Sequence, residues 1–309
     1  MKLASRNRVA SDEEPIGLIA GWGRLPVVAA EAIRQAGYRL YALGIQDHAD
    51  PDIAHYCAHF QWAGLGKLGR SIRYFRQHGV RFATMAGKIQ KVLLLDRFCW
   101  WKHFPDWTCF RTFYPHWISR TCDRKDDTLL LAVVRAYAEA GITFLPVTDF
   151  APELLVPAGL LAGPPLSSAH WKDIAFGWKM AKEMGRLDVG QSVVVKGLAT
   201  IAIEAVEGTD QCIVRAGQLC PSGGFTLVKV AKPQQDMRFD VPTIGPQTLT
   251  TLAAAGGRVL AIEAGKTIVL DMPDVCRLAD QHRISLVAVT PDMLPPLPGE
   301  TPSSDQTCR

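Results

Sequence analysis

Short apolar runs and amphipathic segments alternate along the N-terminal half of the chain. The runs at 15–21, PIGLIAG, and 38–45, YRLYALGI, have the length of buried strands. Residues 27–37 and 126–141 instead repeat their apolar positions at helical spacing and end in glycine. Strands that alternate with helices predict an α/β domain with a parallel sheet. The same patterns predict a helix at 67–79 and strands at 80–87 and 142–147.

A proline-rich segment separates this half from a second α/β series. Residues 146–165 hold five prolines, which interrupt the alternation. We therefore expect an N-terminal Rossmann-like domain at 15–150, a linker at 151–167 and a smaller C-terminal α/β domain at 168–291. The ends at 1–14 and 292–309 are expected to be disordered. The second series predicts helices at 168–185, 209–217, 245–256 and 272–283, a strand or hairpin at 191–206, strands at 224–233 and 284–290, and two strands around a glycine turn at 258–271.

Composition and charge narrow the function classes. Apolar residues make up 48% of the 309 residues, which is enough to bury a core. The formal net charge of +4 fits an anionic small-molecule substrate and falls short of the basic surface of a nucleic-acid binder. The eight cysteines form no CxxC motif, so we expect reduced thiols and no zinc site. No apolar run is long enough to span a bilayer and no secretory signal precedes the first strand, which predicts a cytosolic protein.

A glycine-containing turn follows the first predicted strand. The stretch GLIAGWGRLP places Gly21 and Gly23 between that strand and a helix, where backbone N–H groups can approach a phosphate. The third position of a dinucleotide-binding fingerprint is Pro26, so a tight structural turn explains the pattern equally well. Asp47, the acid that a nicotinamide site would use, lies two residues beyond the second strand. A nicotinamide-dependent oxidoreductase therefore stays an alternative.

The most unusual composition lies at 99–117, CWWKHFPDWTCFRTFYPHW, which holds four of the eight tryptophans. Helical core packing is the favoured interpretation, because aromatic rings bury a large area wherever they find a surface. The alternative is an exposed apolar ledge for acyl chains or a membrane surface. The residues that would rim this ledge are Lys102, His103, Arg111 and Arg120. Metal binding by Cys99, His103, Cys109 and His116 is rejected, since their spacing fits no known site.

Charges of both signs gather at 232–245, KPQQDMRFDVPTIG, between a predicted strand and a predicted helix. Such loops bind anionic ligands in α/β proteins. Carboxylates there can hold Mg²⁺, and lysine or arginine can neutralise phosphate oxygens. A solvated loop with surface ion pairs is the alternative. Upstream, VEGTDQ at 206–211 ends a strand with Glu207 and Asp210, for which helix capping is the alternative, with Thr209 as the expected N-cap.

Several motifs, in order, resemble one family. They are GLIAGWGRLP, AGKI at 86–89, KDDTLL at 125–130, EMGRLDVGQSVVV at 183–195, EAVEGTD at 204–210, KVAKPQQDMRFDVPTIG at 229–245 and IEAGKTIVLD at 262–271. Together, from about residue 15 to about 290, they resemble the UDP-2,3-diacylglucosamine pyrophosphatases of the LpxI type. The resemblance implies a two-domain enzyme that hydrolyses UDP-2,3-diacylglucosamine to UMP and 2,3-diacylglucosamine 1-phosphate, a lipid A precursor. It also implies Mg²⁺ or another divalent cation, a lipid-linked substrate between the domains, and work in the cytosol at the inner membrane surface. It is compatible with a homodimer.

The resemblance also assigns roles. The essential aspartate of the family motif D-[LV]-P-T-I-G falls on Asp240, which would bind Mg²⁺ or hold the attacking water. This places catalysis in the C-terminal domain. A non-catalytic lipid- or sugar-nucleotide-binding protein is a second alternative. The hypothesis names Asp240, Asp236 and Asp210 as metal ligands, and Gly21, Gly23, Lys88, Lys229, Lys232, Arg238 and Thr243 as substrate-binding residues.

Overall fold

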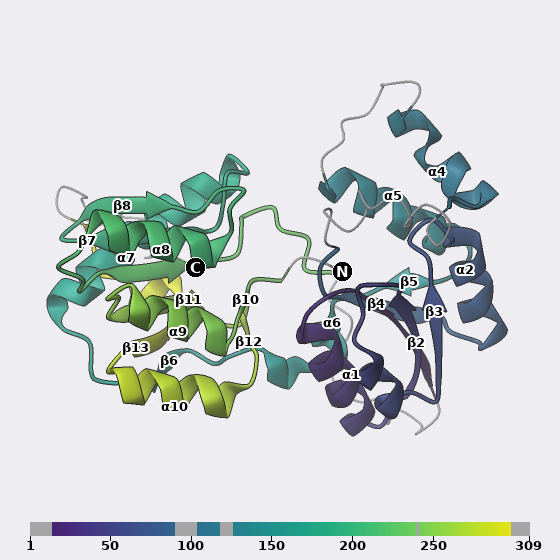
Figure 1. Cartoon of the computed structure of the whole chain (residues 1–309), viewed down its shortest axis with the longest axis horizontal. Coiled ribbons are helices and arrows are strands. Elements are labelled where there is room, and N and C mark those ends of the chain that lie inside the picture. The colour runs from purple at the N-terminus through teal and green to yellow at the C-terminus, as the bar shows by residue number, and fades with distance from the viewer. Residues whose placement is uncertain (1–13, 90–103, 118–125, 239–240, 298–309) are drawn as a thin grey trace, which may run out of the picture. The chain divides into compact units, whose positions relative to one another are not determined.

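The computed structural model describes residues 14–89, 104–117, 126–238 and 241–297. The chain divides into two compact units that meet in sequence at Pro152 and Glu153 (Figure 1). One unit holds a five-stranded sheet and the other a six-stranded sheet, each with helices, which confirms the predicted two-domain α/β class. The predicted tails lie mostly outside the described residues, but the 3₁₀ helix η4 (Pro291–Met293) falls within the C-terminal one.

The first unit is built on a wholly parallel sheet in the order β3-β2-β1-β4-β5. The central strand pairs with a neighbour on each side, and its residues are buried or half-buried on both faces of the sheet, which fits its nearly continuous apolar run. The edge strand β3 was not predicted, because the sequence HFQWA is short and only half-apolar. The strands are β1 (Pro15–Ala20), β2 (Arg39–Ile45), β3 (His59–Ala63), β4 (Phe82–Ala86) and β5 (Thr143–Phe144).

The amphipathic segments predicted at 27–37, 67–79 and 126–141 form three helices of this unit, α1, α2 and α5. One core cluster includes the buried side chains of Tyr41, Phe75, Tyr137 and Phe144, so it joins the sheet to α2 and α5. A fully buried side chain of this size stabilises the fold by roughly 1.5–3 kcal/mol. The helices are α1 (Leu25–Gln35), η1 (Pro51–Tyr56), α2 (Leu68–Gln77), α4 (Trp107–Trp117), α5 (Asp126–Glu139) and α6 (Val147–Phe150).

The aromatic block does not pack as predicted. Within the described part of α4, Cys109 is buried and Phe113 packs against the core, whereas Trp107, Phe110 and Tyr114 are 77%, 36% and 46% exposed. A helix buries only one stripe, and the outward stripe here carries aromatic rings. The expectation of core packing is therefore wrong for these three rings. Lys102, His103 and Arg120 lie outside the described residues.

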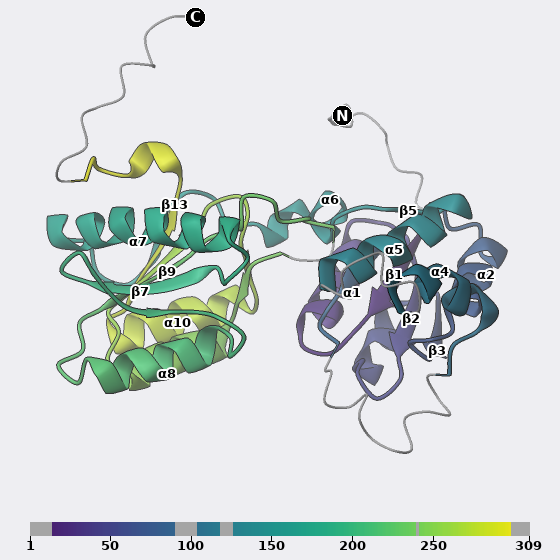
Figure 2. The ribbon, with the colours of Figure 1, turned by 90° about the horizontal axis from the view of Figure 1, so that it is seen from above.

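The second unit is a mixed sheet in the order β6-β13-β11-β9-β7-β8. Strands β9, β11 and β13 are parallel, β7 and β8 form an antiparallel hairpin beside β9, and β6 is antiparallel to β13. Helix α7 covers one face, and α8 and α10 lie on the other (Figure 2). The strands are β6 (Gly159–Ala162), β7 (Ser192–Lys196), β8 (Ala199–Ile203), β9 (Thr226–Lys229), β11 (Val259–Glu263) and β13 (Ser285–Val289).

Two further segments of this unit form strands outside its parallel core. Strand β6 falls in the segment 151–167 that was expected to be a linker, and it extends the sheet. The second of the two strands predicted at 258–271, β12 (Ile268–Val269), pairs with β10 (Thr243–Ile244) in a separate two-stranded sheet. The remaining elements are η3 (Pro152–Leu154), α7 (Ser168–Arg186), α8 (Thr209–Leu219), α9 (Pro246–Ala254) and α10 (Met272–His282).

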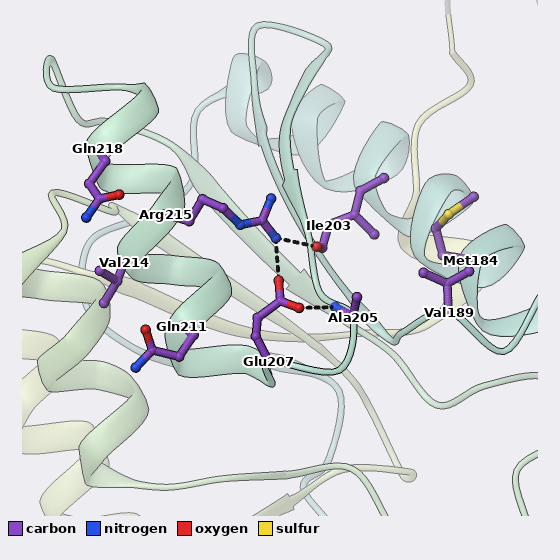
Figure 3. Close-up of a pocket in the computed structure, with 9 residues that line it drawn as sticks. All are labelled: Met184, Val189, Ile203, Ala205, Glu207, Gln211, Val214, Arg215 and Gln218. Carbon is purple, nitrogen blue, oxygen red and sulfur yellow. Dashed lines mark hydrogen bonds and ion pairs between the residues drawn. The ribbon is translucent and has the colours of Figure 1, made fainter. Parts of the chain in front are cut away.

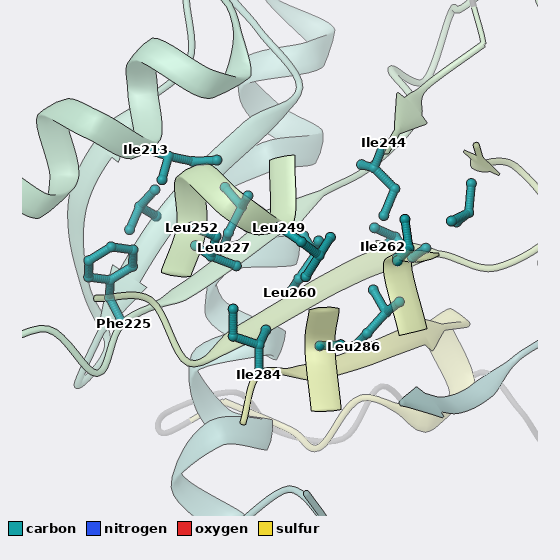
Figure 4. Close-up of a cluster of buried hydrophobic side chains, with 14 of the residues drawn as sticks. Ile213, Phe225, Leu227, Ile244, Leu249, Leu252, Leu260, Ile262, Ile284 and Leu286 are labelled. Carbon is teal, nitrogen blue, oxygen red and sulfur yellow. The ribbon is translucent and has the colours of Figure 1, made fainter. Parts of the chain in front are cut away.

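Close packing holds the helices of the second unit on the sheet. A β-carbon on Gly177 of α7 would lie 2.6 Å from a methyl carbon of Val228, so glycine lets α7 approach strand β9. Ser167 and His170 form a capping box at the start of α7. The opposite face of the sheet holds a wholly apolar core, in which Phe225, Leu227, Leu249, Leu252, Leu260, Ile262 and Leu286 are fully buried (Figure 4).

Candidate functional site

Several strand ends meet at one edge of the six-stranded sheet. Parallel strands β9 and β11 end there with Lys229 and Glu263. Because β7 runs antiparallel to β9, it begins at this edge, and Ser192 is the register partner of Lys229. Strand β8 returns to the same edge, where the Glu204 N–H donates to the Ser192 carbonyl at 2.9 Å. The carboxyl ends of strands are where α/β sheets bind ligands.

Lys229 lies at the centre of a buried polar chain at this edge. Its side chain is only 6% exposed, and Nζ donates to the Thr209 Oγ1 at 2.9 Å. The Thr209 hydroxyl in turn donates to Glu204 Oε1 at 2.8 Å. A buried ammonium is costly unless it is paired, so these contacts hold a positive charge in a fixed place. Thr209 is not the N-cap as predicted, because Gly208 takes that position and Thr209 serves this chain instead.

Two carboxylate oxygens of the same segment make no hydrogen bond within the described part of the chain. They are Glu204 Oε2 and Asp210 Oδ1, and both are buried. Asp210 also sits in the first turn of α8, where the helix dipole favours a negative group. The Ser192 hydroxyl and the Gln191 side-chain oxygen are also buried, and no residue of the described ranges bonds to them. Buried polar atoms normally have partners, so their concentration at one edge marks a place fitted to a polar ligand.

On the face of the sheet that α7 covers, Glu263 holds the start of the loop that follows β9. Glu263 Oε2 accepts from Lys182 Nζ at 2.6 Å and from the Ala231 N–H at 2.8 Å, and Lys266 reaches Oε1 at 3.0 Å. Burial alone would raise the pKa of Glu263, but these hydrogen bonds outweigh it and the pKa is lowered. Burial lowers the pKa of Lys182, and the Glu263 hydrogen bond counteracts part of that shift. The ionised carboxylate of Glu263 thus ties Lys182 of α7 to the backbone of Ala231.

The charged loop beyond Ala231 is only partly at this edge. Lys232 pairs with Asp188 at 2.7 Å, and the Asp188 side chain is 50% exposed, so the pair is a surface contact of small energy. Asp236 and Arg238 are half-buried, and Arg238 is grouped with the first unit. Thr243 lies in β10, where its hydroxyl donates to the Val241 carbonyl at 2.9 Å. Asp240 lies outside the described residues.

The glycine turn of the first unit lies at the switch point of its sheet. Strand β1 is followed by β2 on one side and lies next to β4 on the other, which is where such sheets bind ligands. A β-carbon on Gly21 would lie 2.8 Å from the Lys88 carbonyl oxygen, so this glycine allows the chain after β4 to approach. Trp22 and Lys88 exchange two backbone hydrogen bonds there. Gly23 has a φ of +107° and open space at its β-carbon position. The structure therefore brings Gly21, Gly23 and Lys88 together.

A shallow pocket of about 680 Å³ lies beside the edge strand β8 (Figure 3). Arg215 donates to the Ile203 carbonyl at 2.8 Å and pairs with Glu207, and Glu207 accepts from the Ala205 N–H at 3.2 Å. Hydrogen bonds from its own N–H and from Arg215 lower the pKa of Glu207. This pair satisfies backbone groups of an edge strand, which favours a structural role for Glu207. The lining residues are Met184, Val189, Ile203, Ala205, Glu207, Gln211, Val214, Arg215 and Gln218.

Three residues of this region were not predicted: Glu204, Lys182 and Glu263. The sequence held a signal for Glu204. Residues two apart in a strand point to the same face, so Glu204 is expected on the face of Ala202, which packs in the core. Glu263 likewise ends an apolar strand with a buried carboxylate. Lys182 gives no such signal, since a lysine on an amphipathic helix is ordinarily solvated.

Comparison with known proteins identifies the two units. The model of the LpxI N-terminal domain matches residues 15–154, and that of the LpxI C-terminal domain matches residues 157–287. The chain belongs to the LpxI family. A relative from Caulobacter vibrioides, named UDP-2,3-diacylglucosamine pyrophosphatase LpxI, is 29% identical over 293 residues, which cover 91% of this chain and 99% of that protein.

Each candidate region lies in one of the two matched domains. The glycine turn with Lys88 belongs to the LpxI N-terminal domain, and the Lys229 chain belongs to the LpxI C-terminal domain. In the part of the chain that the structure describes, no helix has both the length and the apolar character needed to cross a membrane. Cysteines 57, 109, 212, 220 and 276 are free thiols, as predicted.

Proposed function

We propose that this chain hydrolyses the diphosphate of UDP-2,3-diacylglucosamine and releases UMP and 2,3-diacylglucosamine 1-phosphate. The observation that carries the proposal is the match to both LpxI domains, together with the named relative that aligns over nearly its whole length. The net charge of +4 is in keeping with an anionic substrate.

The edge of the second sheet supports this chemistry. Hydrolysis of a diphosphate builds negative charge on non-bridging oxygens, and fixed positive groups stabilise that charge best where little water is present. Lys229 offers a buried ammonium, and the N-terminus of α8 adds free N–H groups and a partial positive charge beside it. We assign Lys229 the role of holding a phosphate group of the substrate.

The donor atoms at this edge fit a hard divalent cation in kind. Glu204 Oε2 and Asp210 Oδ1 are buried carboxylate oxygens that find no hydrogen-bond partner among the described residues, and Mg²⁺ prefers oxygen ligands. Among the described residues, no group of three or more His, Cys, Asp or Glu side chains is placed to hold a metal. Because Glu204, Asp210 and Asp236 are all described and form no such group, we propose that Asp210 and Glu204 act with Asp240, and that Asp236 joins them only if the loop after β9 moves. A bound Mg²⁺ would neutralise charge on the diphosphate oxygens.

Asp240 is proposed to orient the attacking water or to bind the cation, which follows from its place in the family motif. The other proposed substrate contacts are Gly21, Gly23 and Lys88 in the first unit, and Lys232, Arg238 and Thr243 in the loop after β9. Lys232 would have to leave Asp188 to reach a phosphate. Because the substrate is lipid-linked, we expect the enzyme to work at the inner membrane surface.

The test is to incubate the full chain with UDP-2,3-diacylglucosamine and Mg²⁺ and to measure UMP by chromatography. Lys229→Met should lower turnover by about 100-fold or more, because one fixed positive donor is lost. Asp240→Asn should lower it at least as far. The matched control is Lys196→Met, since Lys196 donates to Ser222 Oγ at 2.9 Å at the opposite edge of the same sheet.

The result also separates the alternatives. Turnover by Asp240→Asn at the wild-type rate would contradict the assigned role. Substrate binding without UMP release at any Mg²⁺ concentration would indicate a non-catalytic binding protein, and a nicotinamide cofactor that copurifies with the chain would indicate an oxidoreductase.

A further inference from the structure

The outward face of helix α4 is aromatic. Trp107, Phe110 and Tyr114 follow one another at spacings of three and four residues, so they form one stripe. They are 77%, 36% and 46% exposed, and the ring centroids of both neighbouring pairs are 5.8 Å apart. Phe104, just before the helix, is 51% exposed. Contiguous exposed apolar side chains of this size mark an interaction surface.

A single carboxylate fixes this helix to its neighbour. Asp106 Oδ1 accepts from the Cys109 N–H at 2.9 Å, in the first turn of α4. Asp106 Oδ2 accepts from the Arg70 N–H at 3.1 Å, in the first turn of α2. One side chain therefore caps two helices, and its charge favours both dipoles. Asp106 therefore holds the start of α4 against the start of α2.

Basic side chains are frequent on α2 and α4, the two helices that Asp106 joins. Arg70, Arg73 and Arg76 recur every three residues on α2, and all three are exposed. Lys67 places its Nζ 5.9 Å from the centroid of the Phe104 ring. On α4 itself, Arg111 is 74% exposed, and its ion pair with Glu139 at 3.9 Å is too exposed to neutralise it. Neither α2 nor α4 contains an acidic residue.

We propose that this surface, formed by the aromatic face of α4 and the arginines of α2, docks the protein reversibly on an anionic phospholipid bilayer. Trp and Tyr rings favour the interface between lipid headgroups and acyl chains, because one end of each ring is apolar and the other polar. A helix with such a face lies in the plane of the interface, and neighbouring cations are attracted to anionic lipids. The surplus of cations favours an anionic bilayer over an apolar protein groove. The inference does not depend on the catalytic assignment.

The test is cosedimentation of the full chain with vesicles of phosphatidylcholine, with and without phosphatidylglycerol. We expect binding to the anionic vesicles, weaker binding to the neutral ones, and a loss of binding as the salt concentration rises. Combining Trp107→Ser, Phe110→Ser and Tyr114→Ser should weaken the partition coefficient by about tenfold or more. Leu219→Ser, at a side chain of α8 that is 63% exposed, is the matched control and should bind like wild type.

A second variant guards against misfolding of the first. Arg73→Gln together with Arg76→Gln alters no buried side chain, and each lost cation should weaken binding to anionic vesicles by about fivefold. Wild-type binding by both variants would overturn the proposal, as would equal binding of the wild type to neutral and anionic vesicles. A protein that ignores vesicles but forms a dimer in ultracentrifugation, lost in the aromatic variant, would show that the surface binds protein instead.

Discussion

Glu263 offers the sharpest test of how the loop after β9 is held in place. Its side chain is 5% exposed and accepts three hydrogen bonds, from Lys182, Ala231 and Lys266. The substitution Glu263→Gln keeps the shape of the side chain and removes its charge. The amide nitrogen then faces donors, so at least one of the three contacts is also lost outright.

The expected loss can be worked from these contacts. A hydrogen bond to a charged group contributes about 1.5–3 kcal/mol net and a neutral one about 0.5–1.5 kcal/mol. Lowering two bonds, those from Lys182 and Ala231, costs about 2–3 kcal/mol. Lys266 is 54% exposed, so its pair adds little. In the variant, Lys182 still donates a hydrogen bond to the Ala231 carbonyl at 2.9 Å, and its side chain is 24% exposed. The loss of stability therefore stays below the roughly 3–5 kcal/mol that breaking a fully buried ion pair costs.

The assay is urea unfolding of the full chain by circular dichroism. Two units unfold separately unless coupled, so hydrogen exchange of the β9 and β11 amides identifies the relevant transition. The pKa of Glu263 is lowered in the folded state, against about 4.3 in an unfolded chain. Its contribution is therefore full above the unfolded pKa and is lost as the pH falls through the lowered one. The free energies of unfolding of wild type and variant should therefore become equal at acid pH.

The control is Glu183→Gln, which removes an exposed pair with Arg186 at 3.0 Å and should change the free energy of unfolding by less than about 0.5 kcal/mol. The reasoning is refuted if Glu263→Gln costs no more than this control. It is also refuted if the difference from wild type persists unchanged at pH values well below the unfolded pKa of the carboxyl group.

Three further predictions concern other parts of the chain. Asp106→Ala should lower the free energy of unfolding of the first unit by about 2 kcal/mol, because caps of two helices are lost, and Asp106→Asn should cost less; urea unfolding measures both. Gly21→Ala should cost about 1–3 kcal/mol, since its methyl group would meet the Lys88 carbonyl at 2.8 Å; a melting temperature equal to wild type would contradict this. Burial raises the pKa of Cys212 to about 12, so iodoacetamide should leave it unmodified in the native protein and label it in urea, as mass spectrometry of the peptides can show.

The order of strands and helices could be predicted from the sequence because each element buries a face. The helix expected at 67–79 and the strand expected at 284–290 appear as α2 and β13 with ends shifted by one or two residues. Periodicity fixes such elements locally, since a strand repeats every two residues and a helix every 3.6. Periodicity failed at β3 and β6, which are edge strands of five and four residues, too short to show a repeat; β6 also lies in the proline-rich segment.

The candidate site depended more on the tertiary structure. The sequence named Lys229 and Asp210 from their positions at strand and helix ends, but not Glu204, which the β7–β8 hairpin brings to the same edge. Lys182 and Glu263 lie 81 residues apart and meet only because α7 crosses the strand end that carries Glu263.

What the sequence determined by itself was therefore the two α/β series, the family motifs and the local charge of each loop, because these depend on residues close together in the chain. Only the tertiary structure decided which strand ends share an edge, which carboxylates are buried there, and which stripe of α4 faces outward. Those outcomes depend on sheet order and on the rotation of each helix about its axis, and the free energy that sets them comes from contacts between distant segments.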